Sequence, residues 1–581
     1  MNKKFTELFV VELQQNLNFV LYFKHCLLAF FYNSSTIRLQ VPNRRSENMI
    51  KKFPIGIQSF ENIRTGEYFY VDKTSFVYQL ASTGNFYFLS RPRRFGKSLL
   101  VSTMEAFFSG KKDLFEGLVI EKLEDENPVD QKGSWVKGPV IHLDFAASTC
   151  MSIEDLKAKL NSLLLPYEQI YGRDPDDDTL SGRFKRLIQS MYEAYGIGVA
   201  VLIDEYDKPL INSMHDEELN EQLRSELKSF YSVLKTTDQY TKFVFLTGVT
   251  KFSHVSIFSD LNNLEDISMN PEYNEICGLT EEEVSSTFGK EIEALGDKLN
   301  CGREDTVAKL AEWYDGYLFS RSGKRIFNPY SVLFSLKLKV MDYYWFRTGT
   351  PTLVIDSLKI ADFEIPDMTE GIECEKQGFM SCRSTANEPL PLLYQSGYLT
   401  IRSYNEMYHT YLLGFPNYEV KTGFLRSLLP VYFKGQGNEN RNSAVTFARA
   451  VNSGDVDGFM LKLKSLLASI PYDDSNLPTK HLSYEATYRT AVFLLFTLCG
   501  LEMKPEVHMA NGRCDAVLQT ETHVYVFEFK VKGTAEEAVR QIDEKGYALP
   551  YQGTGRQVVK IGVVFDPEIR NIYEYLAVNE K

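Results

Sequence analysis

The segment RPRRFGKSLL, residues 91–100, constrains the fold more than any other part of the chain. It follows a short apolar run at 86–90 and precedes a stretch whose apolar residues recur at helical spacing over 99–108. A strand, a loop ending in Gly-Lys-Ser and a helix are the context of a phosphate-binding loop. The full pattern, G-x-x-x-x-G-K-[ST], would begin with glycine, whereas this chain has Arg91 followed by Pro92. We therefore expect a phosphate loop whose first turn is stiffened by proline.

The residues of this loop have separate expected roles. Gly96 allows the backbone to approach a phosphate closely, Lys97 reaches the β- and γ-phosphate oxygens, and Ser98 ligates Mg²⁺. Arg93 and Arg94 have two alternative interpretations: they are phosphate ligands, or they form a solvated basic turn. Gly-Lys-Ser alone is common by chance, so the neighbouring strand and helix give the match its weight. The expected nucleotide-binding residues of the loop are Arg93, Arg94, Phe95, Gly96, Lys97, Ser98 and Leu99.

A second nucleotide signal is GIGVAVLIDEYDKPL, residues 196–210, an apolar strand that ends in two carboxylates. In such sites the first carboxylate, here Asp204, holds Mg²⁺ through water, and the second, here Glu205, orients the attacking water. Thr247 ends the strand KFVFLTG, where a polar sensor would face the γ-phosphate. Strands alternating with helices predict a parallel sheet whose polar groups meet at the carboxyl ends of the strands. We expect residues 49–275 to form an α/β P-loop NTPase domain that binds ATP and Mg²⁺.

The pattern changes beyond residue 275. Helical segments dominate 276–425, where a helix turning into a strand at 392–401 and a hairpin partner at 408–417 predict a winged-helix-like element. We expect this region to be a helical lid that closes on nucleotide or a surface that recognises a partner, and no motif decides between the two. Residues 426–480 indicate a helical linker. The last part, 481–581, predicts a separate α/β unit in the order helix, strand, turn, strand, helix, strand.

A second site is predicted in the stretch HMANGRCDAVLQTETHVYVFEFKV. Glu528 and Lys530 share one side of a strand, and a short hairpin separates them from Asp515. Asp515 and Glu528 are suited to hold Mg²⁺, and Lys530 to position or activate a water against a phosphodiester. A surface hairpin or a structural Glu–Lys pair is the alternative, although burying these charges in a strand apolar on both faces is costly. The expected supporting residues are Glu485, Gln541 and Tyr547.

The first 48 residues do not predict a membrane span. Their apolar run FVLYFKHCLLAFFY (19–32) contains Lys24 and His25 and falls short of the roughly 20 residues that a bilayer requires. We expect translation to begin at Met49, so that 1–48 is a mispredicted upstream extension; a weak membrane anchor is the alternative. The eight cysteines form no CxxC pair, which indicates a reduced, cytoplasmic chain without a disulfide framework.

The charge balance bears on possible partners. The net charge is −13, and acidic residues outnumber basic ones fourteen to eleven over 481–581. This part of the chain therefore lacks the basic surface that DNA binding favours. Contact with DNA would need lysines and arginines from elsewhere in the chain, or a partner.

Several motifs together resemble one bacterial family, in which an AAA-like ATPase domain is fused to a C-terminal domain of the PD-(D/E)xK nuclease superfamily. The resemblance runs from about Ile50 to the end of the chain. Its motifs are FPIGIQSFENIR, YVDKT, RPRRFGKS, VLIDEYDKP, LTGVTKFS, WYDGY, NPYSV, GRCD, EFK and QI. The family's own loop also lacks the first glycine.

The resemblance implies Mg·ATP at the loop and a restriction-endonuclease-like α/β domain with a metal site at the C-terminal end. Asp515, Glu528 and Lys530 match the PD-(D/E)xK pattern, with Cys514 in place of the usual proline. Three functions follow as hypotheses: an ATP-regulated, Mg-dependent nuclease acting on DNA; a nucleotide-dependent switch whose nuclease-like domain binds nucleic acid or a protein without cutting; and a scaffold with two vestigial sites. AAA-like domains often act as rings, so a homo-oligomer is a further expectation.

Overall fold

The structure is a computed structural model that describes residues 51–580 except for a set of gaps. The gaps are 131, 148–149, 175–177, 215, 252–260, 262, 349–351, 361–364, 366, 381–388, 433–445, 469–491, 495, 497–501, 510–511, 567 and 570. The expected extension at 1–48 and Glu485 lie outside the described residues. Three sheets organise the rest, one five-stranded sheet in each of two α/β parts and a three-stranded sheet between them in sequence.

The first sheet is parallel throughout, as the alternation of strands and helices predicts. Its order is β2-β3-β4-β1-β5, so the strand before the phosphate loop lies next to the strand that carries Thr247 near its end. The strands are β1 (Phe86–Ser90), β2 (Val140–Asp144), β3 (Val199–Asp204), β4 (Thr241–Gly248) and β5 (Glu265–Asp266). Every residue of β1 and β3 is buried, which explains why both are continuous apolar runs.

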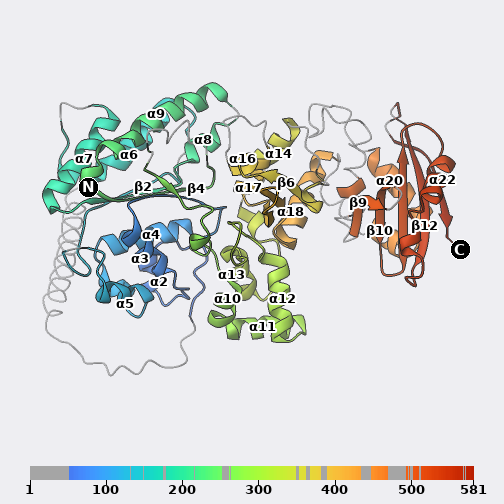
Figure 1. Ribbon diagram of the computed structural model, residues 1–581, viewed down its shortest axis with the longest axis horizontal. Helices are drawn as coiled ribbons and strands as arrows, with labels where there is room; N and C mark the ends of the chain where they lie inside the picture. The colour runs from blue at the N-terminus through green and yellow to red at the C-terminus, as the bar shows by residue number, and fades with distance from the viewer. Residues whose placement is uncertain are drawn as a thin grey trace, which may run out of the picture. The chain divides into compact units, whose positions relative to one another are not determined.

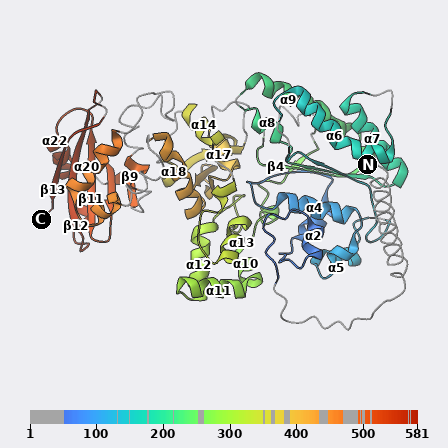
Figure 2. The ribbon, with the colours of Figure 1, turned by 180° about the vertical axis from the view of Figure 1, so that it is seen from behind.

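Helices cover both faces of this sheet (Figures 1 and 2). One face carries α2 (Phe60–Thr65), α3 (Thr74–Thr83), α4 (Lys97–Phe108) and α5 (Val119–Glu126), and the other carries α6 (Ile153–Tyr171), α7 (Leu180–Tyr195) and α9 (Glu217–Thr236). Helix α4 packs directly on β2, β3 and β4, which places the loop before it at the carboxyl ends of the strands. The sequence-predicted α/β architecture of this part is thereby confirmed.

The middle of the chain is mainly helical, as predicted. Its helices are α10 (Glu281–Thr287), α11 (Gly289–Leu299), α12 (Arg303–Tyr314), α13 (Pro329–Leu338), α14 (Thr352–Ile360), α15 (Asp367–Glu370), α16 (Gln377–Met380), α17 (Pro389–Gln395) and α18 (Tyr418–Tyr432). The expected helix and hairpin are present as α17, β7 (Thr400–Asn405) and β8 (Thr410–Gly414). A third strand, β6 (Ile372–Glu375), pairs with the far edge of β8.

The C-terminal sheet has the order β13-β12-β11-β10-β9. Neighbouring strands are antiparallel except β11 and β12, which are parallel because helix α22 crosses between them. The elements are α20 (Val456–Leu467), β9 (Glu502–Met509), β10 (Gly512–Gln519), β11 (His523–Lys530), α22 (Ala535–Lys545), β12 (Gln557–Asp566) and β13 (Asn571–Asn579). The sequence predicts two strands before the crossing helix and one after it, whereas the structure has three before α22 and two after it.

No helix within the described ranges is both long and apolar enough to cross a bilayer. The domain boundaries proposed from the sequence remain predictions.

Candidate nucleotide and metal sites

The phosphate loop ends at Gly96, which caps the first turn of α4. Its φ is +91°, a left-handed conformation that glycine adopts without strain, and a Cβ built there meets no atom within 4 Å. Arg94 also has a positive φ, +71°. No side chain caps the N-terminus of α4, so its first N–H groups face the loop with the positive end of the helix dipole behind them. This is a suitable arrangement for binding phosphate.

Gly96→Ala is expected to leave the protein folded while removing phosphate binding. The left-handed backbone costs alanine about 1–2 kcal/mol, and the added methyl occupies space that a phosphate would use. We expect nucleotide affinity to fall by more than tenfold, measured by titration with a fluorescent ATP analogue. Gly117→Ala is the matched control, because Gly117 has a φ of +75° and equally open surroundings but does not line the cavity. Equal binding by both variants would contradict the assigned loop.

Lys97 is buried inside the loop that it follows. Its ammonium donates hydrogen bonds to the carbonyl oxygens of Arg91 at 2.9 Å and Pro92 at 3.1 Å. Burial lowers the pKa of Lys97, and the charges of Asp204 and Glu205 oppose that shift. Lys97 therefore lies in the loop, where its hydrogen bonds to two backbone carbonyl oxygens can be replaced by bonds to phosphate oxygens.

Asp204 ends β3 and is almost fully buried. Burial raises the pKa of its carboxyl, while a hydrogen bond from Ser98 and the charge of Lys97 lower it. Asp144, at the end of β2, pairs in register with Asp204. The structure therefore brings Ser98 and Asp204 together as predicted, and adds Asp144 as a second carboxylate that the sequence analysis did not single out.

Glu205 follows with a φ of +51° and lines the same cavity as Lys97. Burial raises the pKa of its carboxyl, and the nearby charges of Lys97 and Lys208 lower it. Thr247 lies elsewhere: its side chain is fully buried, and its hydroxyl donates to the carbonyl oxygen of Leu89 at 2.8 Å. The predicted sensor residue is thus at the expected strand end but does not line the cavity.

The cavity in front of the loop has a volume of about 440 Å³. Its polar end includes Arg93, Arg94, Lys97, Ser98, Glu205 and Lys208. Its apolar end includes Ile55, Ile57, Phe69, Val71, Phe288 and Leu333. The apolar end combines the segment before α2 with the helical middle, so both parts of the chain shape one pocket. A polar end for phosphates and an apolar end for a ring fit the two halves of a nucleotide.

Four further loop residues line this cavity and differ in how exposed their side chains are. Arg93 and Arg94 are exposed and line it, and the Arg94 guanidinium stacks 4.9 Å from the ring centroid of Tyr330. Phe95 also borders it, although its ring is buried against Tyr317. Leu99 lines the cavity from the first turn of α4.

Arg91 occupies the position where the general pattern has glycine. Its side chain points into the protein interior. Its side chain is only 1% exposed and donates to the carbonyl oxygens of Ser90 at 2.9 Å, Ser268 at 2.8 Å and Tyr273 at 3.0 Å. Its guanidinium lies 4.2 Å from the ring centroid of Phe319. Arg91 therefore ties the start of the loop to the segment after β5, and does not line the nucleotide cavity.

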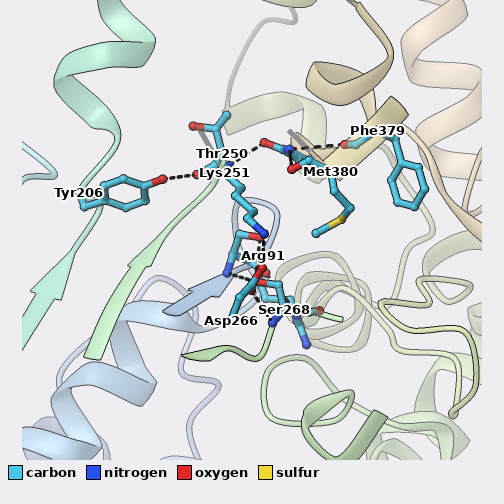
Figure 3. A network of polar contacts seen from close by, with 10 residues as sticks. Arg91, Tyr206, Thr250, Lys251, Asp266, Ser268, Phe379 and Met380 are labelled. Atoms are coloured by element: carbon cyan, nitrogen blue, oxygen red, sulfur yellow. Dashed lines mark hydrogen bonds and ion pairs between the residues drawn. The ribbon is translucent and has the colours of Figure 1, made fainter. Parts of the chain in front are cut away.

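A polar network continues from the strand ends into the middle of the chain (Figure 3). The Asp207 carboxylate accepts from the N–H groups of Val249 at 2.9 Å and Thr250 at 2.6 Å, and from the Thr250 hydroxyl at 2.6 Å. The N–H of Lys251 donates to the side chain of Gln395 at 2.7 Å.

Lys251 and Gln395 each make a further polar contact. The Lys251 ammonium pairs with Asp266, and the Gln395 amide donates to the carbonyl oxygen of Met380 at 2.8 Å (Figure 3). The turn after β3 is thereby connected to α16 and α17 through hydrogen bonds. Asp207 and Gln395 were missed by the sequence analysis, because their partners lie far away along the chain.

The C-terminal site is built on two adjacent antiparallel strands. Ala516 of β10 pairs with Phe527 of β11, so Asp515 and Glu528 come next along the two strands. The Asp515 carboxylate accepts from the N–H of Phe529 at 2.7 Å. The structure therefore brings the predicted pair of carboxylates together at the open end of the hairpin.

Glu528 is 3% exposed, and burial raises the pKa of its carboxyl to about 7. The Asp515 charge adds to this shift, and the Lys530 charge opposes it. One carboxylate oxygen, Oε1, accepts from Gln541 and lies 3.6 Å from the Lys530 ammonium, while Gln541 in turn accepts from Lys530. The other oxygen, Oε2, is buried and has no hydrogen-bond partner among the described residues.

This arrangement fits a divalent cation. A buried carboxylate oxygen without a partner is costly unless a ligand satisfies it, and Mg²⁺ prefers oxygen ligands. Tyr547, also predicted here, is buried beside Gln541, and burial raises the pKa of its phenol. The described residues contain no cluster of three or more His, Cys, Asp or Glu placed to hold a metal, so Asp515 and Glu528 are the donors in view.

Comparisons with known proteins match two separate parts of the chain to two family models. Residues 54–258 match a family model described as a predicted AAA-ATPase, and residues 483–575 match one described as the PD-(D/E)XK nuclease superfamily. A curated relative from Azotobacter chroococcum mcd 1, described as an uncharacterized protein in the vnfD 5' region, is 34% identical over 534 residues. The match covers 90% of this chain and 98% of the relative. The chain belongs to this family, which joins a predicted AAA-ATPase domain to a C-terminal domain of the PD-(D/E)xK nuclease superfamily.

Proposed function

We propose that this protein is a Mg-dependent ATPase coupled to a metal-dependent nuclease that acts on DNA. The observation that carries the nuclease assignment is the buried, unpartnered Oε2 of Glu528 beside Asp515, with Lys530 on the same strand. Most buried polar atoms have a hydrogen-bond partner, so a buried carboxylate oxygen without one is more typical of a metal ligand than of a structural Glu–Lys pair.

At the nucleotide site, the apolar end of the cavity would take the base and the polar end the phosphates. Lys97 exchanges its loop carbonyl partners for phosphate oxygens, and Ser98 with Asp204 would hold Mg²⁺, which neutralises phosphate charge when bound. Glu205 orients the attacking water. Asp144, the register partner of Asp204 on β2, would offer a further carboxylate near the ion.

At the C-terminal site, Asp515 and Glu528 would hold Mg²⁺, which supplies positive charge at a phosphodiester when bound. Lys530 holds the attacking water against the phosphate. Gln541 touches both Glu528 and Lys530, so it fixes the spacing between the metal-binding carboxylate and the lysine. Glu485 is proposed as a further carboxylate of this site, on the basis of the sequence alone.

The test is incubation of the purified full-length protein with plasmid and single-stranded DNA, with Mg²⁺ or Mn²⁺, with and without ATP. Asp515→Ala is expected to remove cleavage by at least about 10³-fold and to leave ATP hydrolysis intact, because it removes a metal ligand. Lys97→Ala is expected to abolish ATP turnover. Glu521→Ala, an exposed carboxylate in the turn between β10 and β11, is the control.

Two outcomes would change the assignment. Wild-type cleavage by a protein that carries both Asp515→Ala and Glu528→Ala would refute the nuclease site. ATP hydrolysis without cleavage of any DNA would favour the alternative, a nucleotide-dependent switch whose C-terminal domain binds nucleic acid or a protein without cutting.

A further inference from the structure

Lys208 is a second lysine at the polar end of the nucleotide cavity. It is half-buried, begins the short helix α8 (Lys208–Asn212), and lines the cavity together with Lys97, Ser98 and Glu205. Its charge acts on the Glu205 carboxyl, as does that of Lys97. Two lysines from different elements therefore act electrostatically on the carboxylate that is proposed to orient the attacking water.

The backbone that carries Lys208 is firmly held. The Tyr206 N–H donates to the carbonyl oxygen of Thr247 at 3.2 Å, and the Lys208 N–H donates to that of Glu205 at 3.0 Å. Asp207, between them, accepts three hydrogen bonds from Val249 and Thr250. The side chain of Lys208 thus extends from a fixed turn, which reduces the entropy lost when it contacts a ligand.

Three other lysines in this part of the chain pair with carboxylates. Lys73, which also lines the cavity, pairs with Glu283 at 2.6 Å, Lys242 pairs with Asp130 at 2.8 Å, and Lys251 pairs with Asp266. The Lys208 ammonium makes no hydrogen bond or ion pair within the part of the chain that the structure describes. A half-buried lysine that lines a cavity and forms no ion pair among the described residues is suited to an anionic ligand group.

We propose that Lys208 is a catalytic residue that contacts the terminal phosphoryl group of ATP and stabilises its charge during transfer. This inference rests on the proposed ATP hydrolysis at the loop. Water adds to the γ-phosphorus, and the bond to the bridging oxygen breaks with its electron pair leaving on ADP. One water proton stays on the inorganic phosphate and the other is released to solvent. Because Lys208 belongs to the same chain as the loop, hydrolysis does not need a cation from a second copy.

The test compares Lys208→Met, Lys208→Gln and Lys208→Arg in the full chain. Both neutral variants are expected to lower kcat by about 10²-fold or more, because one charge on a transferring phosphoryl group has an effect of this order. Their affinity for a non-hydrolysable ATP analogue should fall by about tenfold, while their Kd for ADP stays within about twofold. Lys208→Arg should recover part of kcat. Lys185→Met, an exposed lysine on α7, is the control and should behave as wild type.

Other results would overturn the proposal. An unchanged kcat in both neutral variants would exclude the contact, and an equal loss of ADP and ATP-analogue affinity would assign Lys208 a structural role. Wild-type specific activity that rises steeply with protein concentration, with turnover retained in Lys208→Met, would assign the charge to a second copy. A wild type that neither binds nor hydrolyses ATP would instead refute the proposed function itself, so the two failures are distinguishable.

Discussion

Glu528→Gln is expected to abolish metal-dependent cleavage while making the metal-free protein more stable at alkaline pH. The folded-state pKa of Glu528, about 7, lies above its usual 4.5, so the folded state favours the protonated carboxyl. The stability contributed by that proton is complete below about pH 4.5 and is lost as pH rises through about 7. Above that pH the wild type buries a charge, whereas glutamine remains neutral. The expected gain is about 1–3 kcal/mol at about pH 8.5.

Bound metal is expected to reverse the order of stability of the wild type and Glu528→Gln. A divalent cation bound by Asp515 and Glu528 stabilises the charged carboxylate, so Mn²⁺ should stabilise the wild type and not the variant. The measurement is hydrogen exchange of the β11 amides in the full chain at about pH 6 and 8.5, with EDTA or with Mn²⁺. Glu521→Gln is the control, because its carboxylate is exposed. A variant that is less stable than wild type at about pH 8.5 with EDTA would indicate a structural ion pair with Lys530 and contradict a metal site.

Arg91→Gly restores the general phosphate-loop pattern and is nevertheless expected to destabilise the protein strongly. The wild-type side chain is almost completely buried and satisfies three carbonyl oxygens, on Ser90, Ser268 and Tyr273. Leaving a buried acceptor without a donor costs about 1–3 kcal/mol, so the total is on the order of 3–5 kcal/mol after partial entry of water. The stacking on Phe319 is lost as well.

Arg94→Gly provides the contrast within the same loop. Arg94 is exposed and has a φ of +71°, a conformation that glycine prefers, so the gain in backbone freedom offsets the lost stacking on Tyr330. We expect its unfolding free energy to stay within about 1 kcal/mol of wild type in chemical denaturation. If Arg91→Gly also changes stability by less than about 1 kcal/mol, the anchoring role of Arg91 is wrong.

Local sequence patterns were enough to predict the main elements of both sites. The order of strand, glycine and helix around Gly96 is local, and so is the run of buried residues that ends at Asp204. The hairpin between Asp515 and Glu528 is local as well, because a short turn pairs the two strands and their register places both carboxylates beside one another. Each of these motifs consists of residues that are close in sequence.

Other features depend on distant partners and could not be predicted from the sequence. Arg91 was interpreted as a departure from the phosphate-loop pattern, because its acceptors at Ser268 and Tyr273 are far along the chain. Thr247 was placed correctly at a strand end, but the sequence does not show that its hydroxyl bonds the neighbouring strand at Leu89. The last strand, β13, was not expected, because most of its residues are only partly buried and its periodicity is weak.

The hydrogen bond between Lys251 and Gln395 has a consequence for engineering chimaeras of this family. Its donor is a backbone N–H, so this bond does not depend on the side chain at 251, whereas its acceptor requires a suitable side chain at 395. A chimaera with a junction near residue 275 would combine the turn after β3 of one parent with α17 of the other. Such a hybrid should retain nucleotide turnover only if the incoming α17 carries an acceptor at the position of Gln395. Recombination sites inside this family are therefore constrained by a single amide that lies outside both enzyme-like domains.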